Sequence, residues 1–231
     1  MSTVNRPRPI TTTPLVEGQR LDQPTFHARY EAMPPGTRAE LIGGVVFMPS
    51  PVSYGHGDAL IPVLVWLDRF EESTPGVHTL NDATVILDWR NEPQPDAGLR
   101  IQPEYGGRTR NEGGYVVGPP DLVVEVSRST RYVDLGPKLE EYERAGVLEY
   151  VVRAVDPDEI LWHVLDGGRF VAVAPDQDGL YRSRVFPGLW LDPAALLAGD
   201  RAAVREALDR GTATPEHAAF VAGLAEARNA R

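Results

Sequence analysis

Apolar residues along the chain follow two spacings, a helical one and a strand-like alternation. The helical spacing is typical of helices that cover a core with one face, and it predicts helices at residues 22–33, 57–73, 137–145, 200–211 and 214–231. The alternation, bounded by Gly, Pro, Asn and Asp, predicts a hairpin at residues 38–51 and strands at 76–80, 83–89, 96–102, 122–127, 149–155, 159–165 and 169–175.

The order of these elements indicates the fold class. Strands and helices are interspersed, and a helix separates the strands at 122–127 and 149–155, so we expect an α/β or α+β fold with a mixed β-sheet. Both faces of the 122–127 strand carry Val, which predicts that this strand is covered on both sides. The Gly-rich stretch at 105–120 is expected to form a loop.

Length and composition bound the domain organisation. A chain of 231 residues is long enough for one domain with extensions, or for two domains at most. We expect a flexible N-terminal arm at residues 1–20, a globular domain at 21–198 and a C-terminal helical extension at 199–231. The sequence has no apolar stretch near the length of a membrane span, no secretory signal and no cysteine, so we expect a cytoplasmic protein without disulfides.

The charge balance restricts the partners. The formal net charge is −10 and the pI is about 5.0, which argues against broad, non-specific affinity for nucleic acid, because such affinity rests on Lys and Arg contacts to phosphates. A role on nucleic acid would therefore depend on a local arginine surface, a bound cation or a basic partner.

One carboxylate stands where a core valine would fit. Glu125 lies inside the apolar run "LVVEV". A buried and unpaired carboxylate is costly, so we expect this side chain to be paired, protonated or metal-bound. The alternative is a Glu near the end of a strand that reaches water or an arginine.

Lys138 is the single lysine of the chain, beside 22 arginines among the 23 basic residues. Its ammonium is a compact charge with tunable acidity, whereas a guanidinium is planar and always protonated, so Lys138 indicates a site that requires a lysine. The alternative is chance in the composition. Asp96 follows Pro95 at the start of a predicted strand, which on its own is only a common turn signal.

The three residues are more informative together. Asp96, then Glu125 inside a strand, then Lys138 nearby is the order of a metal-dependent phosphodiesterase site. Two carboxylates hold a hard cation such as Mg²⁺, which activates water and stabilises charge on the phosphoryl oxygens. The ammonium orients the nucleophile or stabilises the transition state.

The motifs "QPDAGLRI", "PPDLVVEVSRST" and "DLGPKLEEYERAGVLEYVV", in this order, resemble those of the Uma-type restriction endonuclease family, a domain of unknown function placed in the PD-(D/E)xK nuclease superfamily. The resemblance covers roughly residues 22–198, from "AELIGGVVFMPSPVSYGHGDAL" upstream to "DGGRFVAVAPDQDGLYRSRVFPGLWLD" downstream. It implies a restriction-endonuclease-like core, in which helices flank a mixed sheet. It also implies an Mg²⁺-dependent (or Mn²⁺-dependent) endonuclease acting on nucleic acid, with DNA as the expected substrate.

Carried over by position, the resemblance implies that Asp96 and Glu125 bind the metal, that Lys138 assists the attacking water and that Glu40 supports the site. Ser127 stands where the superfamily normally has its lysine, which is a departure from the pattern. The family characteristically has its lysine on the following helix, and Lys138 matches that position.

Four further residues have two interpretations each. His56 matches a histidine of the family, but a histidine that opens a helix is more often structural. Tyr142, one helical turn beyond Lys138, is expected in the core. Arg108 and Arg110 could contact a phosphate backbone, although a solvated turn is the simpler expectation for their stretch.

Two alternatives to the endonuclease stay open. The first is a catalytically silent nuclease-fold scaffold or DNA-binding module, which the acidic charge and Ser127 favour. The second is a hydrolase with paired carboxylates, such as a glycosidase, although only Tyr105 and Tyr115 lie in the loop between Asp96 and Glu125.

Two structural expectations follow from the endonuclease hypothesis. A homodimer is expected, because double-strand cleavage needs two sites and because "FPGLW" and the Ala-rich tail offer spare apolar surface. We also expect Lys138 to lie in a solvent-accessible cleft that tolerates a larger head group.

Overall fold

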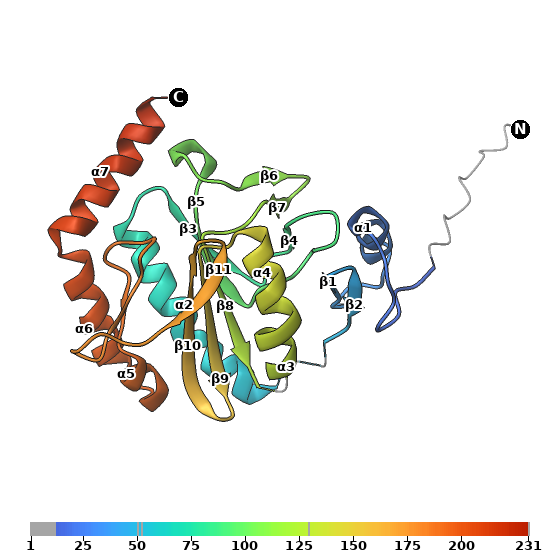
Figure 1. Ribbon diagram of the computed structural model, residues 1–231, viewed down its shortest axis with the longest axis horizontal. Helices are drawn as coiled ribbons and strands as arrows, with labels where there is room; N and C mark the ends of the chain where they lie inside the picture. The colour runs from blue at the N-terminus through green and yellow to red at the C-terminus, as the bar shows by residue number, and fades with distance from the viewer. Residues whose placement is uncertain (1–12, 50, 52, 129, 231) are drawn as a thin grey trace, which may run out of the picture.

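A mixed six-stranded sheet forms the centre of the protein. The computed structural model describes residues 13–49, 51, 53–128 and 130–230. The strands lie in the order β11-β10-β9-β8-β5-β3, and only β8 and β9 pair in parallel (Figure 1). Their bounds are Val77–Asn81 for β3, Ala97–Ile101 for β5, Leu122–Ser127 for β8, Glu149–Val155 for β9, Asp158–Asp166 for β10 and Arg169–Val173 for β11. The mixed sheet predicted from the sequence is confirmed.

Helices cover both faces of this sheet. Leu122 and Val124 of β8 pack in the principal core with α2 (Tyr54–Ser73) and the C-terminal helices. Val123 points to the other face, where it packs with Tyr142 of α4 (Leu139–Ala145). All six residues of β8 are buried, so the prediction that this strand is covered on both sides is correct.

The connection from β8 to β9 is a helical crossover with a break inside it. It comprises α3 (Arg131–Val133), a wide turn η2 (Asp134–Lys138) and α4. The helix was predicted to start at residue 137, but helical structure already begins at Arg131. The break lies at Gly136, whose φ of −118° and ψ of −105° are not helical. The break places Lys138 where its side chain reaches back to β8.

The N-terminal part forms a small unit beside the sheet. It contains α1 (Gln23–Glu31), which the Asp22 side chain caps, and the hairpin of β1 (Glu40–Ile42) and β2 (Val45–Phe47). Leu15 is buried against this unit, and the Gly18 N–H donates to the Val46 carbonyl over 2.8 Å. The expectation of a flexible arm therefore fails for the segment from Leu15 onward, and residues 1–12 lie outside the described part of the chain.

The stretch expected as a Gly-rich loop contains a hairpin. After the short helix η1 (Pro103–Tyr105), β6 (Arg110–Glu112) and β7 (Tyr115–Val117) pair in an antiparallel manner, and β7 also pairs with β4 (Val85–Ile86). Gly113 and Gly114, with φ of 60° and 92°, form the two-residue turn. A Gly-Gly turn with positive φ at both positions is a hairpin signal, and it outweighs the loop composition.

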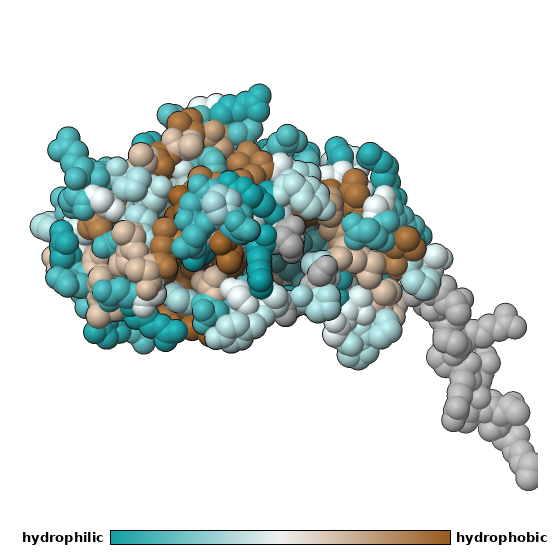
Figure 2. Space-filling view, turned by 90° about the horizontal axis from the view of Figure 1, so that it is seen from below, coloured by the Kyte–Doolittle hydropathy of each residue, from teal (hydrophilic) through white to brown (hydrophobic). Residues whose placement is uncertain are grey.

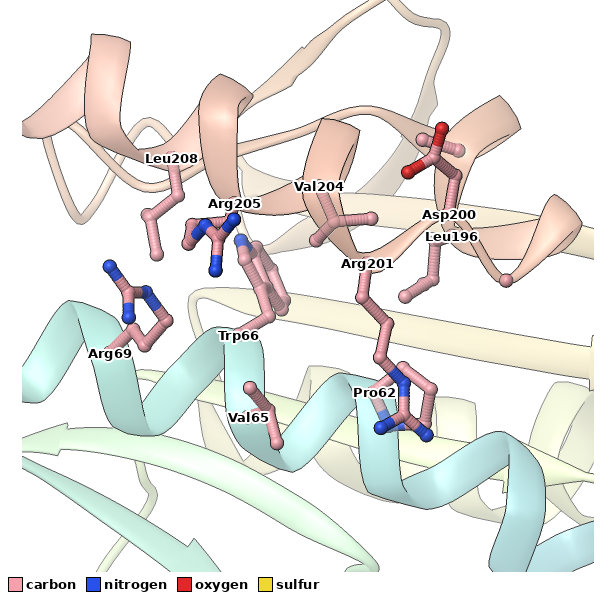
Figure 3. A pocket seen from close by; sticks show the side chains of 12 residues that line it. Pro62, Val65, Trp66, Arg69, Leu196, Asp200, Arg201, Val204, Arg205 and Leu208 are labelled. Atoms are coloured by element: carbon pink, nitrogen blue, oxygen red, sulfur yellow. The ribbon is translucent and has the colours of Figure 1, made fainter.

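The C-terminal segments complete the principal core. These are β12 (Tyr181–Arg182), β13 (Trp190–Leu191), α5 (Pro193–Ala198), α6 (Arg201–Thr212) and α7 (Pro215–Asn229). Figure 3 shows the groove in which α6 faces α2, with Val204 and Leu208 on one side and Trp66 on the other. The Trp66 Nε1–H donates to the Trp190 carbonyl over 2.9 Å, which fixes the end of the "FPGLW" segment onto α2.

The "FPGLW" segment is not spare apolar surface. Phe186 and Leu189 are fully buried in the principal core. This argument for a homodimer is therefore wrong, because the segment is buried in the core of the protein itself. Homodimerisation stays a prediction. Within the described residues, no helix combines the length and apolar character needed to cross a membrane.

We expect Gly98→Ala to destabilise the protein by about 1–3 kcal/mol, the usual range for an overpacked core. A Cβ at Gly98 would lie 2.7 Å from the Leu122 carbonyl oxygen, so β5 and β8 would have to separate. The control is Gly57→Ala in α2, because a Cβ at this position meets nothing within 4 Å. This substitution should stabilise the protein by about 0.5–1 kcal/mol, since Ala favours a helix over Gly. Urea unfolding of both variants measures this, and equal stabilities would contradict the tight β5–β8 contact.

Candidate active site

A cavity of about 300 Å³ opens where the β1–β2 hairpin, the start of α2, the end of β8 and the α3–η2 turn meet. Figure 2 looks onto this end of the molecule and shows a recess with hydrophilic walls beside the N-terminal unit. All four site residues predicted from the sequence line it: Glu40, Asp96, Glu125 and Lys138. Four segments far apart in the chain therefore contribute to one site.

Lys138 lies between two carboxylates. Its Nζ is 3.0 Å from Oε1 of Glu40 and 3.0 Å from Oε1 of Glu125. The Tyr142 hydroxyl donates to the same oxygen of Glu125 over 3.0 Å, and the Gln94 backbone N–H donates to Glu40 over 2.7 Å. Lys138 is only 5% exposed, so the expectation of an accessible cleft around its head group is wrong.

Asp96 reaches the same cavity from the neighbouring strand. Ala97 pairs with Val124 across the sheet, so the residue before β5 lies beside the second half of β8. Oδ2 of Asp96 accepts a hydrogen bond from the Val126 N–H over 2.7 Å, and Oδ1 lies 3.1 Å from Nε2 of His56. His56 is in the first turn of α2, so its contact with Asp96 gives it a definite place in the site.

Negative charge exceeds positive charge in the cavity. Glu40, Asp96, Glu125 and Asp134 all line it together with the single ammonium of Lys138. Burial raises the pKa of Glu125 well above its ordinary value; Lys138 opposes this rise, whereas the other three carboxylates add to it. Burial also raises the pKa of Asp134.

The same surplus keeps Lys138 charged. Burial alone would lower the pKa of its ammonium, but the four carboxylates outweigh burial and raise it well above the ordinary value. Burial likewise favours a neutral Asp96, yet the hydrogen bond and charge of His56 and the Val126 N–H together lower the pKa of Asp96. His56 gains from the same contact: the hydrogen bond to Asp96 outweighs burial and raises its pKa.

The donor set suits a hard cation. Asp96 and Glu125 offer carboxylate oxygens, which Mg²⁺ prefers, and the cluster is short of positive charge. Within the described residues, no three His, Asp or Glu side chains are grouped so that they could hold a metal ion. Asp96 and Glu125 are therefore the two carboxylates that would hold such an ion, and water would have to supply its remaining ligands, as is common for Mg²⁺.

Sequence reasoning missed part of the site, and the two arginines that it weighed as phosphate contacts lie outside the cavity. Tyr142 is in the core as expected, but its hydroxyl also contacts Glu125. Asp134 was not singled out, because an Asp in a turn carries no signal until the turn packs beside β8. Arg108 donates to Asp121 and to the Gly146 carbonyl, and the largely exposed Arg110 pairs with Glu112; neither lines the cavity.

The sheet, its flanking helices and the acidic cluster around a lysine define a nuclease-fold protein. The model of the Uma2 family, described as "Putative restriction endonuclease", matches residues 24–194, and the chain belongs to this family. A solved structure with a similar fold is a "putative nuclease belonging to DUF820" from Anabaena variabilis. The two share 11% sequence identity with a TM-score of 0.53, over 68% of this chain and 87% of that one. No curated protein matches the sequence.

We expect Lys138→Met to destabilise the protein by about 3–5 kcal/mol at pH 8, because it leaves buried carboxylates without their cation. The pKa of Glu125 is already raised, and it rises further without Lys138. A group with a raised folded-state pKa loses its stabilising contribution as pH rises through that pKa, so the deficit should shrink toward pH 5. Urea unfolding between pH 5 and pH 8 measures the trend.

The matched control is the double variant Glu125→Gln with Lys138→Met. It removes the titrating carboxylate together with the ammonium, so its stability should depend less on pH than that of Lys138→Met. A deficit for Lys138→Met that is the same at pH 5 and pH 8 would contradict the charge surplus around Glu125.

Proposed function

We propose that the protein is a metal-dependent endonuclease that hydrolyses phosphodiester bonds, with DNA as its substrate. The observation that carries this proposal is the buried Lys138 between Glu40 and Glu125, in one cavity with Asp96. Membership of a restriction endonuclease family supports the reaction class, and the similar fold of a solved nuclease is consistent with it.

Each residue has a distinct role in the proposed reaction. Asp96 and Glu125 would hold Mg²⁺ or Mn²⁺, which when bound supplies an acidified water and charge compensation at the phosphoryl oxygens. Lys138 would orient the attacking water with its ammonium. Glu40 positions Lys138 through their ion pair.

Two neighbours fix the orientation of the metal-binding carboxylates. The His56 ring contacts one oxygen of Asp96, and the Tyr142 hydroxyl donates to one oxygen of Glu125. Partners of this kind hold ligating carboxylates in place and are costly to remove from metal sites. His56 and Tyr142 are therefore positioning residues in this proposal.

A catalytically silent scaffold or DNA-binding module is the second candidate. Lys138 is engaged by two carboxylates in the structure, and Ser127 stands where the superfamily normally has its lysine. Both features are consistent with a pocket that has lost catalysis. The cleavage assay below distinguishes the two candidates.

For the endonuclease, we expect Lys138→Arg to lower the cleavage rate by about tenfold or more, equivalent to at least about 1.4 kcal/mol of transition-state stabilisation. The planar guanidinium keeps the charge but cannot reproduce the compact ammonium between Glu40 and Glu125. The assay follows linearisation of supercoiled plasmid and of circular single-stranded DNA with Mg²⁺ or Mn²⁺. Because Lys138 is buried, a melting curve must accompany each rate.

The control for this assay is Glu140→Gln, which removes an exposed carboxylate on α4 outside the cavity and should cleave like the wild type. Equal cleavage rates for Lys138→Arg and wild type would show that Lys138 has no role in orienting the attacking water. Failure of the wild type to cut either circle with either metal would favour the silent scaffold.

Metal binding gives a test that does not depend on turnover. We expect Asp96→Asn and Glu125→Gln each to weaken Mn²⁺ binding by about tenfold or more, because each removes one charged oxygen ligand. Calorimetric titration with Mn²⁺ measures the affinity, with Glu140→Gln again as the unaffected control. Wild-type affinity in both variants would show that the ion does not bind between these carboxylates.

A further inference from the structure

The rim of the cavity differs in chemistry from its acidic floor. Tyr132, in α3, lines the cavity, and its side chain is 74% exposed. Phe47 at the end of β2 and Met48, Pro49 and Pro51 after it also line the cavity. Apolar side chains gathered around one cavity indicate a contact surface, whereas single exposed ones are common on any protein. The rim therefore offers apolar and aromatic surface to a flat, apolar group.

A second exposed tyrosine, Tyr54, follows the cavity residue Ser53 in the chain but does not itself line the cavity. Tyr54 is 88% exposed and stands in the first turn of α2, between Ser53 and His56, which both line the cavity. Arg128 is close by, because its Nη1 donates to Ser53 over 2.9 Å. Among the described residues Arg128 has no carboxylate partner within ion-pairing distance, so its charge is free for an anion.

In the part of the chain that the structure describes, two arginines line the cavity, which limits the kind of nucleic acid that fits. They are Arg128 and Arg38, and Arg38 is already paired with Asp82. A duplex carries one negative charge per about 1.7 Å of its axis and is usually held by many phosphate contacts. The acidic floor and the net charge of −10 oppose such a dense polyanion. Stacking of bases on aromatic rings adds affinity without added positive charge.

Resting on the proposed function, we propose that this site takes single-stranded rather than base-paired nucleic acid. Unpaired bases stack on Tyr132, Arg128 contacts a phosphate, and the backbone enters the cavity toward Asp96 and Lys138. The cavity volume of about 300 Å³ is at the small end of ligand sites, which suits one flexible nucleotide at a time. A duplex would have to open before a nucleotide could enter.

Binding is tested apart from cleavage, in EDTA, by fluorescence anisotropy. The probes are a labelled oligo-dT of about 20 nucleotides and a labelled duplex of the same length. The single strand should bind about tenfold more tightly or better. Tyr132→Ala should weaken this binding by about tenfold, equivalent to about 1.4 kcal/mol, whereas Tyr132→Phe keeps the ring and should stay close to wild type.

The matched control is Trp89→Ala, because Trp89 is also an exposed aromatic residue, at 66%, but does not line the cavity. It should bind the single strand like wild type. With about one or two phosphate contacts, a plot of the logarithm of the binding constant against the logarithm of the salt concentration should have a slope of about −0.7 to −1.4. Arg128→Ala should make this slope shallower.

The outcomes separate this inference from the proposed function. Duplex binding as tight as single-strand binding, no measurable binding of oligo-dT, or full affinity in Tyr132→Ala would each overturn the single-strand inference. None of these results bears on whether a circular DNA is cut. Tight, Tyr132-dependent binding of oligo-dT without cleavage under Mg²⁺ or Mn²⁺ would instead support the inference and overturn the endonuclease.

Discussion

The site depends on one electrostatic constraint, the clustering of four carboxylates, three of them buried, around one ammonium at the end of β8. Lys138 pairs with Glu40 and Glu125 at 3.0 Å each, and its charge is what allows these carboxylates to remain buried. The cluster still has more negative than positive charge, which is why the pKa of Glu125 is raised well above its ordinary value. A bound cation would relieve this imbalance, so the proposed metal dependence and the stability of the fold rest on the same interaction.

The architecture creates this cluster by joining segments that are distant in the chain. The parallel pairing of β8 and β9 requires a helical crossover, and the break at Gly136 within it directs Lys138 back onto β8. Antiparallel pairing of β5 with β8 brings Asp96 to the Val126 N–H. The β1–β2 hairpin adds Glu40 from outside the sheet. Hydrophobic packing on both faces of β8 holds these parts in register.

The proposed chemistry and the proposed recognition use different parts of one cavity. The buried floor holds the charged groups, where a low-dielectric surrounding strengthens their interactions. The exposed rim carries Tyr132 and Arg128, which line the cavity and are largely exposed to solvent. This division lets a protein of net charge −10 act on a polyanion, because affinity comes from stacking and catalysis from a local cation.

The sequence by itself determined the mixed sheet, most of its strands and the order Asp96, Glu125, Lys138, because apolar periodicity and a motif are properties of local chain segments. It also contained the Gly113-Gly114 turn signal of the 105–120 hairpin, which the loop-like composition masked. It misjudged the "FPGLW" segment, whose residues find partners far away in the chain. Only the tertiary structure decided that Lys138 is buried, that Tyr142 contacts Glu125 and that Asp134 joins the cluster. Burial and charge surplus are sums over neighbours from many segments, so no single stretch of sequence contains them.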